Sequence, residues 1–217
     1  MSSIILESQY FPPIATMAVL EQSTTVVFDV HEHFVKGSYR NRCHICGANG
    51  LLRLSVPLLK GKHQRRAVKD VQISYDHDWQ KLHWQSIETA YRRSPYFEYY
   101  EDDFKELFSK RYAYLVGLNQ ATLKWFKDHV GLRVEFNNSQ SYVAELVKGT
   151  VDLRSQIHPN AAKNTFQVKP PAYQQVYSNK LDFIPNLSIL DLVFNLGPRS
   201  KNYLQELTLN TDVAGSV

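Results

Sequence analysis

The sequence has little of what marks proteins outside the ordinary globular class. It contains two cysteines, Cys43 and Cys46, which is too few for a disulfide framework. No apolar run approaches the roughly 20 residues that a membrane helix needs. The first residues lack the basic segment and the long apolar segment of a signal peptide. We therefore expect a cytoplasmic protein without a membrane span.

A strong net charge and a phosphate-binding motif are missing as well. The formal net charge of +4 suits an anionic ligand but is too small to indicate a nucleic-acid-binding protein. The basic stretch at residues 59–67 contains Gly61 but lacks the spacing of a P-loop. We interpret its cations as a solvated loop, with recruitment of an anionic substrate or of nucleic acid as the alternative. These cations are Lys60, Lys62, Arg65 and Arg66.

Aromatic residues, by contrast, are abundant. The 13 tyrosines and 11 phenylalanines accompany a hydrophobic content of 43%, which is enough to bury a core in a chain of 217 residues. We expect one domain over residues 1–207 and a flexible tail over 208–217. Most rings should pack in the core, although tyrosine also suits the wall of a pocket for a polar ligand.

The first thirty residues predict a strand–helix–strand unit. Residues 3–9 and 24–30 are apolar and partly β-branched, and Pro13 suits the first position of a helix that ends near residue 22. Parallel strands joined by a helix cross over right-handed and bind ligands beyond their carboxyl ends. We therefore expect Gln9–Pro13 and Asp29–His33 to share one rim, facing free N–H groups of the helix.

A hairpin should follow this unit. Residues 39–46 and 51–58 flank the sequence Gly47-Ala48-Asn49-Gly50, and Asn-Gly is a strong turn signal. Period-two alternation predicts that Arg40, Arg42 and His44 share one face of the hairpin. A face with three basic groups indicates contact with solvent or with an anion.

The remainder of the chain mixes helical and extended patterns. Its expected elements are a strand at 68–75, helices from Trp79, after Pro95 and over 112–129, a strand at 132–136, a helix at 139–148, an irregular stretch at 150–180, and helices at 186–194 and 199–207. Together these elements predict a single α/β domain, in which a small mixed sheet opens with the strand–helix–strand unit and an aromatic-rich helical region covers it.

The densest group of proton-transferring side chains follows the second predicted strand. Asp29, His31 and His33 alternate along the chain, so they share one side of an extended segment. An aspartate that orients a histidine is a standard general-base arrangement, and we predict that these three residues are catalytic. The alternative is a loop whose histidines face water.

Nearby polar residues extend this site to substrate binding. Arg40 and Arg42 carry planar forks suited to phosphate or carboxylate, with a solvated strand face as the alternative. His83 lies on an apolar helical stripe, where a hydrogen-bonded core histidine is the default, and core packing is the default for Tyr91. The residues predicted to bind a small anionic or sugar-type substrate are Gln9, Tyr10, Lys36, Arg40, Asn41, Arg42, His83 and Tyr91.

The stretch Cys43-His44-Ile45-Cys46 invites a zinc interpretation, with His31 and His33 as further ligands. Zinc needs four convergent ligands, whereas the two cysteines point to opposite faces of the predicted strand and the sequence has no second pair. We therefore expect no metal at this position, and nothing in the sequence indicates a cofactor.

Several short stretches occur in a joint order that is more specific than any one of them. They are Gln9-Tyr10-Phe11-Pro12-Pro13, Phe28-Asp29-Val30-His31, Lys36 with Ser38-Tyr39-Arg40-Asn41-Arg42, Leu54-Ser55-Val56-Pro57, Trp79 with His83, Ala90-Tyr91 with Ser94-Pro95-Tyr96-Phe97, and Asn186-Leu187-Ser188-Ile189-Leu190-Asp191. In this order they resemble the WbqC-like family of bacterial proteins over roughly residues 4–197. The resemblance implies a context in cell-surface polysaccharide synthesis, and it names no reaction.

We therefore expect a transferase, or a related modifying enzyme, that acts on a sugar or a nucleotide-linked sugar. Asp29 would orient His31 or His33 as the base that activates a hydroxyl or an amine. Lys36, together with the two arginine forks, would hold a phosphate or a carboxylate. The alternative is a non-catalytic module that binds a glycan or a partner of the same pathway, either a second copy of the chain or a pathway enzyme.

Overall fold

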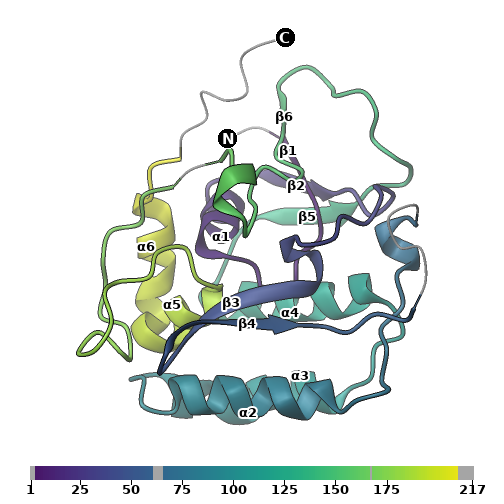
Figure 1. Cartoon of the computed structure of the whole chain (residues 1–217). Coiled ribbons are helices and arrows are strands. Elements are labelled where there is room, and N and C mark those ends of the chain that lie inside the picture. Colours follow the sequence, from purple (N-terminus) through teal and green to yellow (C-terminus); the bar gives the residue numbers. More distant parts are fainter. Residues whose placement is uncertain (1–2, 61–65, 167, 210–217) are drawn as a thin grey trace.

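A four-stranded parallel sheet forms the centre of the computed structural model, which describes residues 3–60, 66–166 and 168–209 (Figure 1). Its strands lie in the order β5-β2-β1-β6. Their bounds are β1 Ser3–Leu6, β2 Thr25–Phe28, β5 Glu135–Asn138 and β6 Thr150–Asp152. All three pairings are parallel, so the carboxyl ends of the strands meet at one edge of the sheet.

The predicted strand–helix–strand unit is present at the start of the chain. β1 leads through helix α1, Ile14–Glu21, into β2, and Ile4 pairs with Val26. Every residue of α1 from Ile14 to Leu20 is buried, as expected for a helix that is apolar on all sides. It contacts helices α5, Ile189–Leu196, and α6, Ser200–Glu206.

The predicted hairpin is also present, but it is separate from the parallel sheet. Strands β3, Arg42–Gly47, and β4, Gly50–Ser55, pair antiparallel around the turn Ala48-Asn49, and Gly50 takes a φ of 103°. β3 contacts α5 and helix α2, Trp79–Tyr91, and Figure 1 shows the hairpin lying over the helical layer. The expected α/β fold is confirmed, with its parallel and antiparallel parts in two sheets.

Aromatic side chains fill the space between the helices. Helix α3, Phe97–Ser109, contacts α2 and α5, and helix α4, Leu115–Val130, packs against α3. The wholly buried Phe104 lies at the centre of the cluster. Its ring neighbours are Phe11, Trp84, Phe108, Trp125, Phe126 and Phe194. This arrangement is the aromatic-rich helical cover that the sequence predicts.

Two predicted elements are wrong. Residues 68–75 form no strand, because a 3-10 turn, Val68–Asp70, places Val68 and Val71 in the core three residues apart. Residues 139–148 form no helix, because the backbone of Val143 bonds to charged side chains, donating to Asp29 and accepting from Arg154.

The region over 150–180, predicted to be irregular, contains the short strand β6. Three residues are too few for a period-two pattern, and β6 exists because it pairs with β1. Parts of two other predictions lie outside the described residues. These are residues 61–65 of the predicted basic loop and residues 210–217 of the predicted tail.

Gly197→Ala should destabilise the fold strongly. Gly197 follows α5 with a φ of 54°, and an added Cβ would overlap the ring of Tyr96. Backbone strain and overpacking together should lower the free energy of unfolding by about 3 kcal/mol or more, measured by urea denaturation. Gly117→Ala is the matched control, since Gly117 lies within α4 and its nearest atom would be 3.9 Å away. That substitution should gain up to about 1 kcal/mol, and equal effects at both positions would contradict the packing around Gly197.

Candidate active site

A polar side chain lies at or just after the carboxyl end of each strand of the parallel sheet. Glu7 follows β1, Asp29 follows β2, Ser139 follows β5, and Asp152 ends β6. The chain moves outward from β1 to β2 and β5, and then returns to the other side of β1 as β6. Such a reversal of strand order opens a crevice beyond the carboxyl ends, where α/β proteins bind ligands.

A cavity of about 640 Å³ lies at this edge. This volume falls within the range of small-molecule binding sites. The residues that line it are His31, Glu32, His33, Tyr142, Asp152 and Arg154. Two of the three residues predicted to be catalytic, His31 and His33, therefore face one cavity, and the third lies directly behind it.

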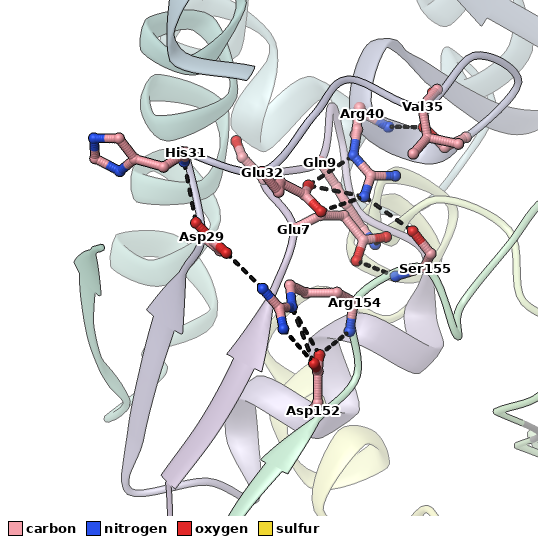
Figure 2. A network of polar contacts seen from close by, with 12 residues as sticks. Glu7, Gln9, Asp29, His31, Glu32, Val35, Arg40, Asp152, Arg154 and Ser155 are labelled. Carbon is pink, nitrogen blue, oxygen red and sulfur yellow. Dashed lines mark hydrogen bonds and ion pairs between the residues drawn. The ribbon is translucent and has the colours of Figure 1, made fainter. Parts of the chain in front are cut away.

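Asp29 is wholly buried, and Figure 2 shows its carboxylate bonded to the backbone of His31 and to Arg154. One oxygen accepts from the backbone N–H of His31 at 3.1 Å and from the Ser139 hydroxyl at 2.9 Å. The other accepts from Arg154 Nη1 at 2.6 Å and from the backbone N–H of Val143 at 3.3 Å. A buried charge is tolerated when it is paired and hydrogen-bonded in this way, so Asp29 ties three loops together.

Ser139 connects Asp29 to the ring of His31. Its hydroxyl hydrogen goes to Asp29, and its oxygen lies 3.1 Å from His31 Nδ1. Since that oxygen has no second hydrogen to give, Nδ1 must donate, and the neutral ring keeps a free lone pair on Nε2. Asp29 therefore reaches the His31 ring only through the Ser139 hydroxyl, and the catalytic role of the two residues stays a prediction. Ser139 lies 110 residues beyond Asp29, and no local pattern marks it.

Arg154 lies between two carboxylates. Its Nη1 bonds to Asp29, while Nη2 and Nε bond to Asp152 at 2.5 and 3.0 Å. Its guanidinium also lies over the ring of Tyr142, 5.5 Å from the centroid. Hydrogen bonding to Asp152 raises the pKa of Arg154 further, so the group stays charged. Sequence reasoning missed Arg154 because the strand before it was not recognised.

A second buried ion pair joins Arg40 to Glu32. Arg40 Nε and Nη2 each donate to a different Glu32 oxygen at 2.8 Å, and Nη2 also donates to the Ser155 hydroxyl at 3.0 Å. The backbone N–H of Ser155 donates to Glu7 at 2.8 Å. Ser155 reaches both partners because it adopts a φ of 60°, a strained conformation for a residue other than glycine.

Carboxyl groups outnumber guanidinium groups in this network. It combines the acids Glu7, Asp29, Glu32 and Asp152 with the bases Arg40 and Arg154. Burial raises the pKa of Glu32 to about 7, because desolvation and repulsion by Glu7 and Asp29 outweigh the attraction of Arg40. Near neutral pH this carboxyl group therefore exchanges its proton readily, as general acid–base catalysis requires.

The predicted basic face of the hairpin does not include Arg40. That residue lies in the 3-10 turn Tyr39–Asn41 before β3, and its guanidinium turns toward Glu32, away from the face shared by Arg42 and His44. Arg40 is wholly buried and does not lie on the strand face, because its guanidinium pairs with Glu32 and donates to the Ser155 hydroxyl. Lys36 and Arg42 line a different cavity, described below.

The other predicted binding residues lie in or near the core. The hydroxyl of Tyr10 lies 3.0 Å from His83 Nδ1, and burial lowers the pKa of His83 to about 4. Tyr91 is wholly buried against Phe194. The remaining two residues are already hydrogen-bonded. Gln9 bonds to the side chains of Glu7 and Thr16, and the Asn41 side chain donates to the carbonyl of Val56.

Both cysteines are buried within β3. Burial raises the pKa of the Cys43 thiol, and it raises that of Cys46 to about 11, so neither is a reactive thiolate. Across residues 3–60, 66–166 and 168–209, no three His, Cys, Asp or Glu side chains are grouped to hold a metal ion. Among the same residues, no helix is long and apolar enough to span a membrane.

The fold and the site define an α/β protein with a cavity lined by acidic and basic side chains, here called the acid–base cavity, at the carboxyl edge of a parallel sheet. The WbqC-like protein family model matches residues 7–165, which include the whole network from Glu7 to Ser155, and the chain belongs to this family. It is 24% identical over 226 residues to the uncharacterized protein Rv1507c of Mycobacterium tuberculosis, covering 93% of this chain and 96% of that protein. No solved structure matches the chain.

Glu32→Gln should change the pH dependence of stability. The folded pKa of about 7 lies above the unfolded value of about 4.3, so folding favours the protonated carboxyl. Its contribution is complete below about pH 4 and is lost as the pH rises through about 7. Relative to Glu32→Gln, the wild type should therefore lose on the order of 3 kcal/mol of unfolding free energy over this window.

Chemical denaturation at a series of pH values measures this difference. The histidines with lowered pKa values, His44, His83 and His158, titrate in both proteins and cancel in the comparison. A difference that grows in favour of the wild type as the pH rises would mean that Arg40 controls the Glu32 carboxyl and holds its pKa low.

Ser139→Ala should release the tautomer of His31. In the wild type, the neutral imidazole should carry its hydrogen on Nδ1, because Ser139 accepts there. Nitrogen-15 NMR of the imidazole distinguishes the two tautomers, and the variant should shift toward the Nε2–H form that free histidine prefers. Ser141→Ala is an exposed control that should leave the His31 signals unchanged. An Nε2–H ring in the wild type would contradict the hydrogen bond from His31 Nδ1 to Ser139.

Proposed function

We propose that this protein is a modifying enzyme of the transferase class, acting on a sugar or a nucleotide-linked sugar in bacterial surface-polysaccharide synthesis. The observation that carries the proposal is the Asp29–Ser139–His31 relay, which lies beside Glu32 in one cavity. Membership of the WbqC-like family supports the pathway through the resemblance described above. Transfer of a group to a hydroxyl or an amine requires an oriented base and a proton donor. His31 and the Glu32 carboxyl, whose pKa is near neutral, supply these two groups.

In the proposed reaction, a hydroxyl or amine of the acceptor sugar attacks the group to be transferred. The bond from the acceptor oxygen or nitrogen forms as the bond to the leaving group breaks. His31 Nε2 takes the proton that the acceptor loses, and Asp29 stabilises the resulting imidazolium through Ser139. Glu32, whose pKa of about 7 leaves a protonated fraction near neutral pH, gives its proton to the leaving group in that form.

The walls of the cavity suit a sugar. Tyr142 is 59% exposed and offers an aromatic face to the apolar side of a sugar ring. Asp152 supplies carboxylate oxygens that accept hydrogen bonds from hydroxyl or amino groups. Because carboxyl groups outnumber guanidinium groups here, a neutral or cationic acceptor fits this cavity better than an anion does.

One observation favours the alternative, a non-catalytic glycan- or partner-binding module. Both guanidinium groups of the network are already occupied by carboxylates, as they would be in a scaffold that only shapes a binding surface. The two functions differ in what His31 does. A binding module needs the shape of the cavity, whereas a transferase needs the lone pair on Nε2.

His31→Ala should remove transferase activity while the fold is retained. Loss of a general base should lower kcat by about 10²- to 10⁴-fold, measured by product formation from sugar nucleotides with acyl, aminoacyl or glycosyl donors. Glu32→Gln should also lower kcat, and it should remove the step near pH 7 from the pH–rate profile. His77→Ala is the matched control, because His77 is exposed and lies outside the cavity.

Thermal unfolding of each variant verifies that the fold is intact. Wild-type rates in His31→Ala would overturn the transferase assignment. Glycan binding without turnover in the wild type, unaffected by His31→Ala, would favour the binding module.

A further inference from the structure

A second cavity, of about 470 Å³, lies beside the hairpin and is strongly basic. We call it the hairpin groove. Its charged or titratable lining residues are Lys36, Arg42, His44, Arg53, His158 and Lys163. No Asp or Glu belongs to its lining within the described part of the chain. The groove therefore carries four permanent cations without a compensating carboxylate.

The pairing of the hairpin explains how the cations come together. Arg42 stands opposite Ser55, and His44 stands opposite Arg53, so these side chains share one face of the antiparallel pair. The other face, with Cys43, is buried in the core. Like charges on one face of a hairpin repel one another. Because the core fixes the opposite face, the hairpin cannot turn to separate them.

Two buried donors in this groove have no acceptor. Arg42 Nε and His158 Nε2 are inaccessible and have no partner among the described residues. His158 is 8% exposed, and its Nδ1 accepts the backbone N–H of Asn160 at 3.0 Å. The neutral ring must therefore carry its hydrogen on Nε2. Buried donors are rarely left unpaired, so both atoms point to an acceptor that the described residues do not supply.

We propose that the hairpin groove binds the phosphoryl groups of a small-molecule ligand, with a pyrophosphate unit as the best match. A ligand with a single carboxylate would neutralise only one of the four cations, whereas a pyrophosphate carries several negative charges. The guanidinium forks of the two arginines also suit phosphate oxygens. A compact groove of this volume holds a few phosphoryl groups, whereas a nucleic acid needs a continuous basic stripe with exposed aromatic rings.

The groove and the acid–base cavity are lined by residues of the same two segments of the chain. Residues 31–44 contribute His31 to the cavity and Lys36 and Arg42 to the groove. Residues 152–163 likewise contribute Arg154 to the cavity and His158 to the groove. His158 also interacts electrostatically with Glu7 and Arg40, behind the cavity. If the proposed transferase function holds, a phosphorylated donor bound in the groove would extend toward His31. Binding of an anion in the groove does not depend on that function.

Isothermal titration calorimetry of the full chain at low salt tests the proposal, with inorganic pyrophosphate, uridine diphosphate and inorganic phosphate as probes. Pyrophosphate should bind more tightly than phosphate, and affinity should fall steeply with added salt. Arg53→Gln should weaken pyrophosphate binding about tenfold, and Arg53→Gln combined with Lys163→Gln about a hundredfold. Both residues are exposed, so the fold should tolerate the changes.

Arg93→Gln is the charge-matched control, since Arg93 is exposed and lies outside the groove. Tighter binding of uridine diphosphate than of pyrophosphate would support the proposal and identify a nucleotide as the source of the phosphates. Unchanged pyrophosphate affinity in the double variant, or tighter binding of single-stranded RNA that the double variant loses, would overturn it.

The two proposals fail separately. His31→Ala should bind pyrophosphate as the wild type does, because His31 lies outside the groove. Loss of turnover with intact pyrophosphate binding leaves the groove assigned, whatever the reaction is. Turnover without pyrophosphate binding would support the transferase assignment and overturn the proposal that the groove binds phosphoryl groups.

Discussion

The site depends on one buried charge, the carboxylate of Asp29. It lies at the end of β2, excluded from water, and a carboxylate there would be costly without donors. Its donors come from the loops after β5 and β6, through Ser139, Val143 and Arg154. The same bonds that stabilise the charge therefore position His31, hold the 139–148 loop and fix Arg154 beside the cavity.

Two cavities of opposite character result from this arrangement. The carboxyl edge of the sheet concentrates acids around two enclosed guanidinium groups, while the hairpin face carries cations without acids. Arg40 belongs with the acids of the sheet edge, because its buried side chain pairs with Glu32 and does not join the basic face. In our proposals, this separation lets one chain hold a polar acceptor and a phosphorylated group side by side.

The outline of the fold was readable from the sequence because its signals are local. The β1–α1–β2 unit, the Asn-Gly hairpin and the aromatic helices all follow from nearby residues. The sequence also indicated His31 and His33 as neighbours of one cavity, since both follow a strand directly. Their catalytic roles, and the binding roles predicted for other residues, remain predictions.

Other parts of the site were not readable, because long-range bonds create them. β6 exists through its pairing with β1, and without β6 nothing indicated Arg154. The 139–148 segment has a composition that suits a helix, yet Asp29 and Arg154 take its backbone bonds. Arg40 fits the alternation of a strand, but a buried carboxylate from eight residues earlier decides where its side chain points.

The position of β6 in the chain also determines when the site comes into being. During synthesis, β1, α1 and β2 emerge early and bring Asp29 with them, whereas its arginine partner is made more than a hundred residues later. A nascent chain that ends before β6 holds a carboxylate whose counter-ion does not yet exist. The polar network around Asp29 is therefore completed by the late half of the translated chain, and the early fragment has no means of assembling it alone.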